Sequence, residues 1–341
     1  MSDITCYRWL LRLCDPEGYG DLPYVTLSGR QAANLLLLAE SHGVAGTVAR
    51  NMKAVLHGEG PERLLARRAD MGALRDMFET VDRKSLGEVG ITLLLRERAR
   101  QVIEAMHDAG FPVAIVKGED FADRLYPQPH LRLFRDIDLM MPRSVIDLVE
   151  PVMTSLGFHF VKPEGKYNSD YGERTWDGST RPLTRVELHW NMITCPSQRV
   201  TSSLAYDEIQ WAPTRGGIQA TPDSMLLIAA VHASISHRFD RLQHLCDIRQ
   251  LCRGRAGALN AELLHDTAKR LGLRSALAVA LQVTAKLLKE PACTQLLERL
   301  PRTSLSPVWR LLVSERSLLM PERRFSKLRR SVIREWLKHV S

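Results

Sequence analysis

Apolar residues recur at helical spacing in the first third of the chain. The pattern surrounds Trp9-Leu10-Leu11 and continues over residues 31–39, where Ser28 is placed to cap a helix. A longer helical pattern covers residues 89–109, and Gly110 is placed to end it. The sequence therefore predicts a helical segment before the central part of the chain.

The central part changes to short apolar runs that predict strands. These runs lie at residues 113–116, 137–141 and 158–161. Ser144 is placed to cap a helix that reaches Leu156 and ends at Gly157.

Residues 185–190 alternate strictly, which places Val186 and Leu188 on one face of a strand and Glu187 and His189 on the other. Residues 162–182 read as a polar loop. The loop holds residue types that stack on a base or bind a phosphate: Lys166, Tyr167, Tyr171, Arg174 and Trp176. A long strand connection without a role in substrate binding is the other interpretation.

Composition places the chain among globular proteins of more than one structural unit. It has 341 residues, of which 45% are hydrophobic and 25% charged. We expect a helical segment over 1–85, a catalytic core over 86–220 and a helical domain over 221–341. No apolar run reaches the roughly 18 residues that cross a bilayer, and the six cysteines form no Cys-x-x-Cys pair. A cytoplasmic protein with reduced thiols is expected.

The net charge of +8 is concentrated at the C-terminal end. Residues 321–341 hold seven Lys or Arg residues and two Glu residues, a balance of +5. Apolar residues recur there at helical spacing, which predicts a basic amphipathic helix. Such a helix could pack on the domain, contact RNA or another acidic partner, or lie on a membrane surface.

The strongest chemical signal is a pair of acids at the start of the run 137–141. Asp136 and Asp138 are two residues apart, so both project to one side of a strand. Two carboxylates about 4 Å apart repel by roughly 4 kcal/mol at an effective dielectric near 20. A bound divalent cation removes that repulsion, and Mg²⁺ suits carboxylates that also face substrate phosphates. Glu187 would complete an acidic triad if the two strands are neighbours.

Five segments together resemble a bacterial group of uncharacterised nucleotidyltransferases within the DNA polymerase beta-like superfamily. The segments are Val116-Lys117-Gly118, Leu125-Tyr126-Pro127, Arg132, Asp136-Ile137-Asp138-Leu139 and Glu187-Leu188-His189-Trp190. A further match runs from Leu226 through His232 and His237 to Asp247-Ile248, so the resemblance covers about residues 86–255. It implies an α+β fold: a polymerase-beta-type core with a small mixed sheet, embedded between helical segments.

The resemblance also implies a reaction, namely transfer of a nucleoside monophosphate from an NTP to a hydroxyl acceptor. Asp136 and Asp138 would hold two Mg²⁺ ions, and Glu187 would bind the one that activates the acceptor. Lys117, Gly118 and Arg132 would bind the triphosphate. The superfamily commonly has Gly-Ser or Gly-Gly after its first strand, whereas this chain has Lys117-Gly118-Glu119-Asp120. The phosphate cradle is therefore expected to differ.

Histidines mark the expected acceptor side of the cleft. His189 would orient Glu187 by a hydrogen bond. In the following helical segment His232, His237 or Asp247 would line the acceptor side, with one serving as base. A zinc site is disfavoured there, because His232 and His237 are five residues apart and a regular α-helix spreads them around its axis. A packing role for these histidines is the main alternative.

The acceptor itself remains open among a protein or peptide hydroxyl, an RNA 3′ end and a small metabolite. Two other functions stay open as well: phosphoryl transfer at the same metal site, and a catalytically idle nucleotide-binding or regulatory protein. Three mutually repelling acids argue against the idle protein.

Overall fold

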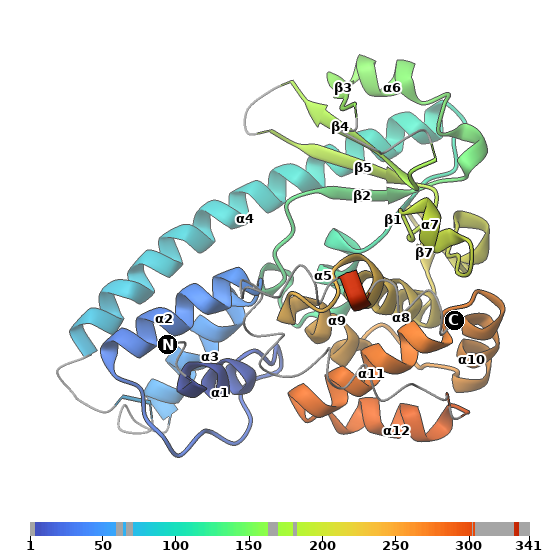
Figure 1. Cartoon of the computed structure of the whole chain (residues 1–341). Coiled ribbons are helices and arrows are strands. Elements are labelled where there is room, and N and C mark those ends of the chain that lie inside the picture. Colours follow the sequence, from blue (N-terminus) through green and yellow to red (C-terminus); the bar gives the residue numbers. More distant parts are fainter. Residues whose placement is uncertain are drawn as a thin grey trace.

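The chain combines a small mixed sheet with surrounding helices, as the computed structural model shows for residues 4–58, 64–65, 71–162, 170–179, 183–301, 303 and 331–333 (Figure 1). The helices of the first half are α1 (Ile4–Leu13), α2 (Gly29–Ser41), α3 (Ala45–Gly58), α4 (Met71–Asp108), α5 (Gly118–Leu125), η3 (Pro129–Leu131), η4 (Arg143–Val145) and α6 (Glu150–Ser155). Those of the second half are α7 (Pro196–Arg199), η5 (Tyr206–Glu208), α8 (Pro222–Val231), η6 (His232–Ser236), α9 (Leu242–Cys252), α10 (Ala261–Arg270), α11 (Arg274–Leu288) and α12 (Pro291–Arg299).

Five strands form the main sheet in the order β1-β2-β5-β4-β3. They are β1 (Ala114–Ile115), β2 (Ile137–Met140), β3 (Phe158–Phe160), β4 (Glu173–Gly178) and β5 (Arg185–His189). β2 and β5 pair in parallel and every other pair is antiparallel. A separate hairpin joins β6 (Trp211–Thr214) to β7 (Gly217–Ala220). The expected α+β class with a small mixed sheet among helical segments is confirmed.

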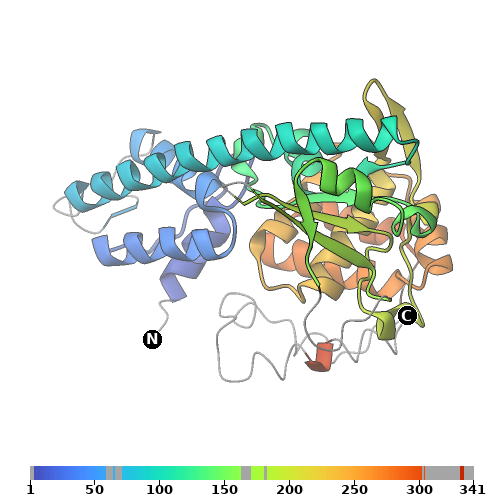
Figure 2. The ribbon, with the colours of Figure 1, turned by 90° about the horizontal axis from the view of Figure 1, so that it is seen from above.

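The sheet has one apolar and one polar face, and alternation along β2 and β5 decides which residues go where. Ile137, Leu139, Val186 and Leu188 enter a core that also contains one side of α4. Figure 2 shows α4 running along the sheet on this side. Asp138, Glu187 and His189 therefore project from the opposite face, toward the C-terminal helices.

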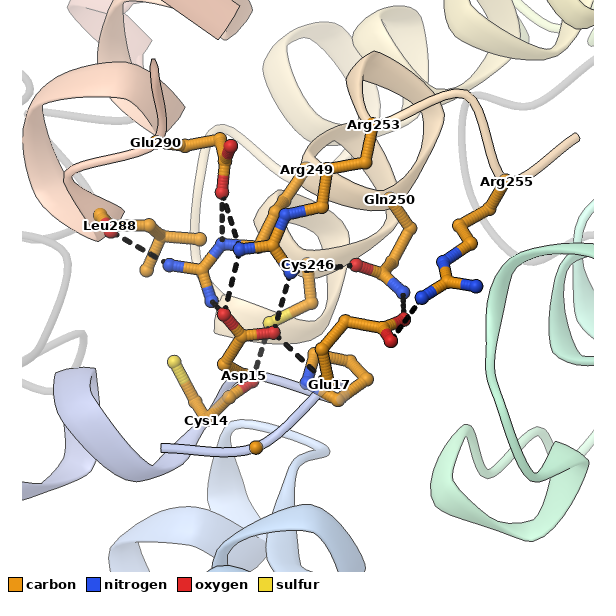
Figure 3. A network of polar contacts seen from close by, with 12 residues as sticks. Cys14, Asp15, Glu17, Cys246, Arg249, Gln250, Arg253, Arg255, Leu288 and Glu290 are labelled. Atoms are coloured by element: carbon orange, nitrogen blue, oxygen red, sulfur yellow. Dashed lines mark hydrogen bonds and ion pairs between the residues drawn. The ribbon is translucent and has the colours of Figure 1, made fainter. Parts of the chain in front are cut away.

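The N-terminal helices α1 to α3 share a second core with α8, α9, α11 and α12. Ser28 caps α2 with a capping box that includes Gln31, as the sequence predicted for the cap. A polar network crosses this interface (Figure 3). In it Asp15 contacts Arg249 at 3.2 Å and Arg253 at 2.8 Å, and Arg253 also contacts Glu290 at 2.7 Å. The network thereby joins the segment after α1 to α9 and to the turn between α11 and α12.

Two predicted helices differ from those observed. α4 begins at Met71 rather than near 89, because Leu74 and Phe78 pack into the second core and anchor its first turns. The expected boundary at residues 85 and 86 falls inside this helix. The helix expected from Ser144 is broken, and α6 starts at Glu150 because Pro151 is tolerated only in a first turn.

The prediction of a polar loop over 162–182 was partly wrong, because β4 occupies residues 173–178. Its residue Trp176 is 1% exposed and packs in the sheet core, so it does not face substrate. Arg174 pairs with Asp147. Lys166 and Tyr167 lie outside the described residues.

The basic segment 321–341 also lies outside them, except for a short helical piece at 331–333. Across the ranges that the structure describes, no helix is both long and apolar enough to span a membrane.

Candidate active site

A cavity of about 730 Å³ opens on the polar face of the sheet. Strands β2, β4 and β5 form one wall, the turn into α5 another, and η6 with α9 the side facing the sheet. Most of the expected site residues line it: Lys117, Gly118, Arg132, Asp136, Asp138, Glu187, His189, His232 and His237. A cavity of this size lies within the range of small-molecule sites, about 300–1,000 Å³.

Asp138 lies at the centre of the polar groups. It is directly opposite Glu187 in the parallel pairing of β2 with β5, so both side chains project from one face. Oδ1 of Asp138 lies 2.7 Å from Nζ of Lys117 and 2.9 Å from Nε2 of His189. Ligand atoms of Asp138, Glu187 and His189 all lie within 4.8 Å of one another. The structure thus brings two of the three predicted acids together, and Asp136 lines the same cavity one residue before β2.

His189 contacts Asp138 rather than Glu187, from which its Nε2 is 3.7 Å away. Its other ring nitrogen, Nδ1, lies 3.2 Å from Oε2 of Glu173 on β4. His189 therefore bridges two acids, and the expectation that it orients Glu187 gives way to this arrangement. Glu173 was missed from the sequence because its strand was read as a loop, although Glu173, Thr175 and Asp177 alternate with other residues there.

The turn from β1 into α5 places Lys117 under backbone strain. Its φ of 57° and ψ of −135° lie in a region that side chains other than glycine rarely adopt, which costs about 1–3 kcal/mol. Gly118 follows at φ +24°. This conformation directs the buried Lys117 ammonium to Asp138 instead of solvent. A lysine held in a strained turn beside an acid indicates a functional constraint.

Arg132 fixes this turn from behind. Its Nη1 donates to the carbonyl oxygen of Gly118 at 3.1 Å, while Nε and Nη2 donate to Asp247 at 2.8 and 2.9 Å. Tyr126 also donates to Asp247, at 2.8 Å. These contacts favour a positioning role for Arg132 over the direct phosphate contact expected from sequence. They also hold Asp247 in a buried ion pair, with its carboxylate turned to Arg132.

Burial and mutual repulsion set the protonation of the acids. Burial raises the pKa of Glu187 to about 7, and the negative charge of Asp138 contributes to that rise. Burial, followed by Asp138, also raises the pKa of Asp136. Burial acts the same way on Asp138, but Lys117 and His189 outweigh it and hold its pKa far below the ordinary value.

His189 is the second cation of the site. Burial and the charge of Lys117 oppose its protonation, yet hydrogen bonds with Asp138 and Glu173 outweigh them and raise its pKa to about 9. A raised pKa favours the imidazolium form at neutral pH, with Nε2 hydrogen-bonded to Asp138 and Nδ1 beside the Glu173 carboxylate.

The charges do not balance without a further cation. Four carboxylates (Asp136, Asp138, Glu173 and Glu187) surround two cations (Lys117 and His189), so ionisation of all four acids would leave an excess of negative charge in this group. Burial is the main cause of the raised pKa values of Asp136 and Glu187, and the negative charge of Asp138 adds to it. A divalent cation would neutralise the excess charge, and carboxylate oxygens are the ligands that Mg²⁺ prefers. The residues present fit such an ion.

Metal affinity should accordingly rise with pH through about 7. Below that value Glu187 is protonated, and a binding cation must displace its proton. One displaced proton lowers the affinity about tenfold for each pH unit below the pKa. Titration of Mn²⁺, an oxygen-binding substitute for Mg²⁺, at pH 6, 7 and 8 measures this slope. The Glu187→Gln variant should show a flatter profile, and equal slopes in both proteins would contradict the assignment.

Three histidine rings gather on the cavity wall facing the acids. The ring centroids of His232, His237 and His244 are each 4.5 Å from the other two. The expectation that His232 and His237 point apart was wrong, because the chain forms a π-helical turn at His232–Ser236 rather than an α-helix. His244, which the sequence analysis did not place in the site, completes the group.

A family described as uncharacterised nucleotidyltransferase matches residues 28–289. A search of curated proteins gives no match. Among solved structures, the antibiotic-resistance factor ANT(2'')-Ia is 16% identical, with 55% of this chain and 95% of that chain covered at a TM-score of 0.36. An antigenic nucleotidyltransferase-like protein from Paracoccidioides brasiliensis is 15% identical, with 63% of this chain and 93% of that chain covered at a TM-score of 0.37.

Proposed function

This chain belongs to the family of uncharacterised nucleotidyltransferases, and from that premise we propose that it transfers a nucleoside monophosphate from an NTP to a hydroxyl acceptor, with Mg²⁺. The family match confirms the resemblance drawn from the sequence motifs. One observation carries the proposal. Asp138 and Glu187 lie side by side on two parallel strands and face a cavity in which a divalent cation would offset the clustered carboxylates. Asp136 and Lys117 line the same cavity.

Asp136 and Asp138 would hold the cation that accompanies the triphosphate, and Glu187 would hold a second one on the acceptor side. When bound, Mg²⁺ would stabilise negative charge on the triphosphate and favour ionisation of the acceptor hydroxyl. Lys117 pairs with Asp138. Its ammonium lines the same cavity, where it would contact a phosphate oxygen of the NTP as a compact point charge.

His189 would keep the acids in place. Its contacts with Asp138 and Glu173 fix the position of Asp138, and its positive charge offsets part of the acidic excess. Gly118 would let a phosphate approach the backbone at the start of α5, while Arg132 holds the Gly118 carbonyl.

The acceptor would approach from the side of η6 and α9. His232 and His237 line that wall, and Arg241 at the start of α9 adds a positive charge. A protein or peptide hydroxyl, an RNA 3′ end and a small hydroxylated metabolite are all compatible with this opening. The excess of basic residues in 321–341 favours RNA among them, since phosphate contacts dominate such binding.

Phosphoryl transfer would use the same acids, so the bond broken in the NTP decides between the two reactions. Asp136 and Glu187 argue against an idle binding protein. Burial disfavours the ionised form of both side chains, so an acid at either position does not serve the stability of the fold.

Incubation with ATP, GTP, CTP or UTP labelled at the α or γ phosphate tests the proposal, with tRNA, protein extract and a metabolite pool as acceptors. Transfer of the α label with release of pyrophosphate supports nucleotidyl transfer, and the labelled fraction identifies the acceptor class. Transfer of the γ label would replace the proposal with phosphoryl transfer. Magnesium-dependent nucleotide binding without transfer of either label to any acceptor would favour the idle protein.

A further inference from the structure

The three histidines facing the acids come together through an irregular stretch of chain. His232 begins η6, where the backbone N–H of His237 donates to the carbonyl oxygen of His232 at 3.0 Å. A hydrogen bond between residues five apart defines a π-helical turn, and such a turn places those two residues on the same side of the helix. π-turns inside helices occur frequently at functional sites.

The chain then reverses through two left-handed residues. Arg238 has a φ of 52° and Phe239 a φ of 58°, and neither is glycine. Left-handed backbone costs about 1–2 kcal/mol for each such residue. Burial of Phe239, 1% exposed, compensates part of that cost. The reversal starts α9 where His244 faces His232 and His237, so the strained backbone produces the cluster.

A carboxylate lies beside two of the rings. Oδ1 of Asp240 is 3.4 Å from Nδ1 of His237 and 4.0 Å from Nδ1 of His244. Histidines that bind a metal usually have a carboxylate or carbonyl next to the ring nitrogen that does not bind it. His244 is 5% exposed, and its Nδ1 has no hydrogen-bond partner among the described residues. A buried polar atom left in this state costs about 1–3 kcal/mol.

Two of the three rings favour the neutral form that binds metals. Burial lowers the pKa of His232 and His244 well below the ordinary value, and nearby positive charges lower it further. Their imidazoles are therefore neutral at physiological pH and carry a free lone pair. Ligand atoms of all three residues lie within 4.8 Å of one another. A tetrahedral ion bound at about 2.0–2.1 Å would need them roughly 3.4 Å apart, a small inward movement.

We propose that His232, His237 and His244 bind one divalent transition-metal ion, with Zn²⁺ the best fit, and leave its fourth position open to the cavity. Three imidazoles suit Zn²⁺ and do not suit Mg²⁺, which prefers oxygen. The two walls of the cavity would therefore hold different ions.

This site goes beyond the proposed nucleotidyl transfer, because it assigns a metal ion to three histidines that the transfer reaction uses only as lining, and because it is measured without turnover. Full-length protein stripped of metal is titrated with Zn²⁺ against a chromogenic chelator, and its visible spectrum is recorded with Co²⁺. One equivalent of Zn²⁺ and an intense tetrahedral Co²⁺ spectrum are expected. Asp240→Asn should weaken Zn²⁺ binding by about 10–100-fold, and His237→Gln, which removes a ligand, should weaken it further.

His159→Gln is the matched control, because His159 is exposed on β3 and lies outside the cluster. It should leave Zn²⁺ binding unchanged, as should Asp136→Asn in the acidic site. The side chain of His237 is 34% exposed, so its replacement should preserve folding, which circular dichroism verifies. Wild-type binding below one equivalent, equal affinity in folded His237→Gln, or loss of Zn²⁺ in either control variant would overturn the site.

Discussion

Replacing Asp136 with asparagine should lower turnover about a thousandfold or more without loss of stability. A metal ligand supplies several kcal/mol of transition-state stabilisation, and about 1.4 kcal/mol corresponds to a factor of ten. Burial and Asp138 already disfavour ionised Asp136, so a neutral amide of the same size relieves repulsion. Calorimetric titration with Mg²⁺ and ATP should show that most magnesium-dependent nucleotide binding is lost.

Asp138→Asn should abolish the same binding and also destabilise the protein. Repulsion alone would make the two acids equivalent, but Asp138 pairs with the buried Lys117 and with His189. Removing one partner of a buried ion pair typically costs about 3–5 kcal/mol, because the remaining charge stays buried. Urea unfolding of both variants separates the two effects. Unchanged nucleotide affinity in Asp136→Asn would refute the assignment, and equal stability of the two variants would refute the role of Lys117.

Much of the polar face of the sheet could be predicted from residue alternation alone. Alternation in β5 places Glu187 and His189 opposite Val186 and Leu188, and the structure has them on opposite faces of the sheet. Strand alternation is a local property, so it can be read without knowing the fold. Whether β2 and β5 are neighbours could not be read in this way, because it depends on pairing across about fifty residues.

The parts that sequence reasoning missed depend on long-range or irregular structure. Arg132 and Asp247 look like separate functional residues in the sequence, yet they form one buried ion pair that fixes the Gly118 turn. The histidine cluster depends on a π-turn that no α-helical spacing rule anticipates. β4 was not predicted because most of its residues are polar. Only alternate positions near its end, such as Trp176, are buried.

Glu187→Gln should reduce turnover to background while largely sparing nucleotide binding. Glutamine keeps the shape of the side chain but cannot become an anion, so the cation on the acceptor side would lose its ligand. The pKa of Glu187 is about 7, and an acid whose pKa is raised in the folded state destabilises the fold as pH rises from its unfolded value toward 7. The variant should therefore match wild-type stability at acidic pH and exceed it near pH 8.

Glu173→Gln distinguishes this catalytic role from a general effect of removing an acid. Glu173 lies on the same face but contacts His189, so its loss should lower the pKa of His189 and shift the pH profile of turnover without abolishing it. Single-turnover rates and ATP affinities of both variants across pH 6 to 9 give the comparison. If Glu187→Gln lost ATP binding yet retained turnover at saturating ATP, Glu187 would belong to the nucleotide side of the site. Equal loss of turnover in both variants would assign catalysis to the whole charge network, with His189 at its centre.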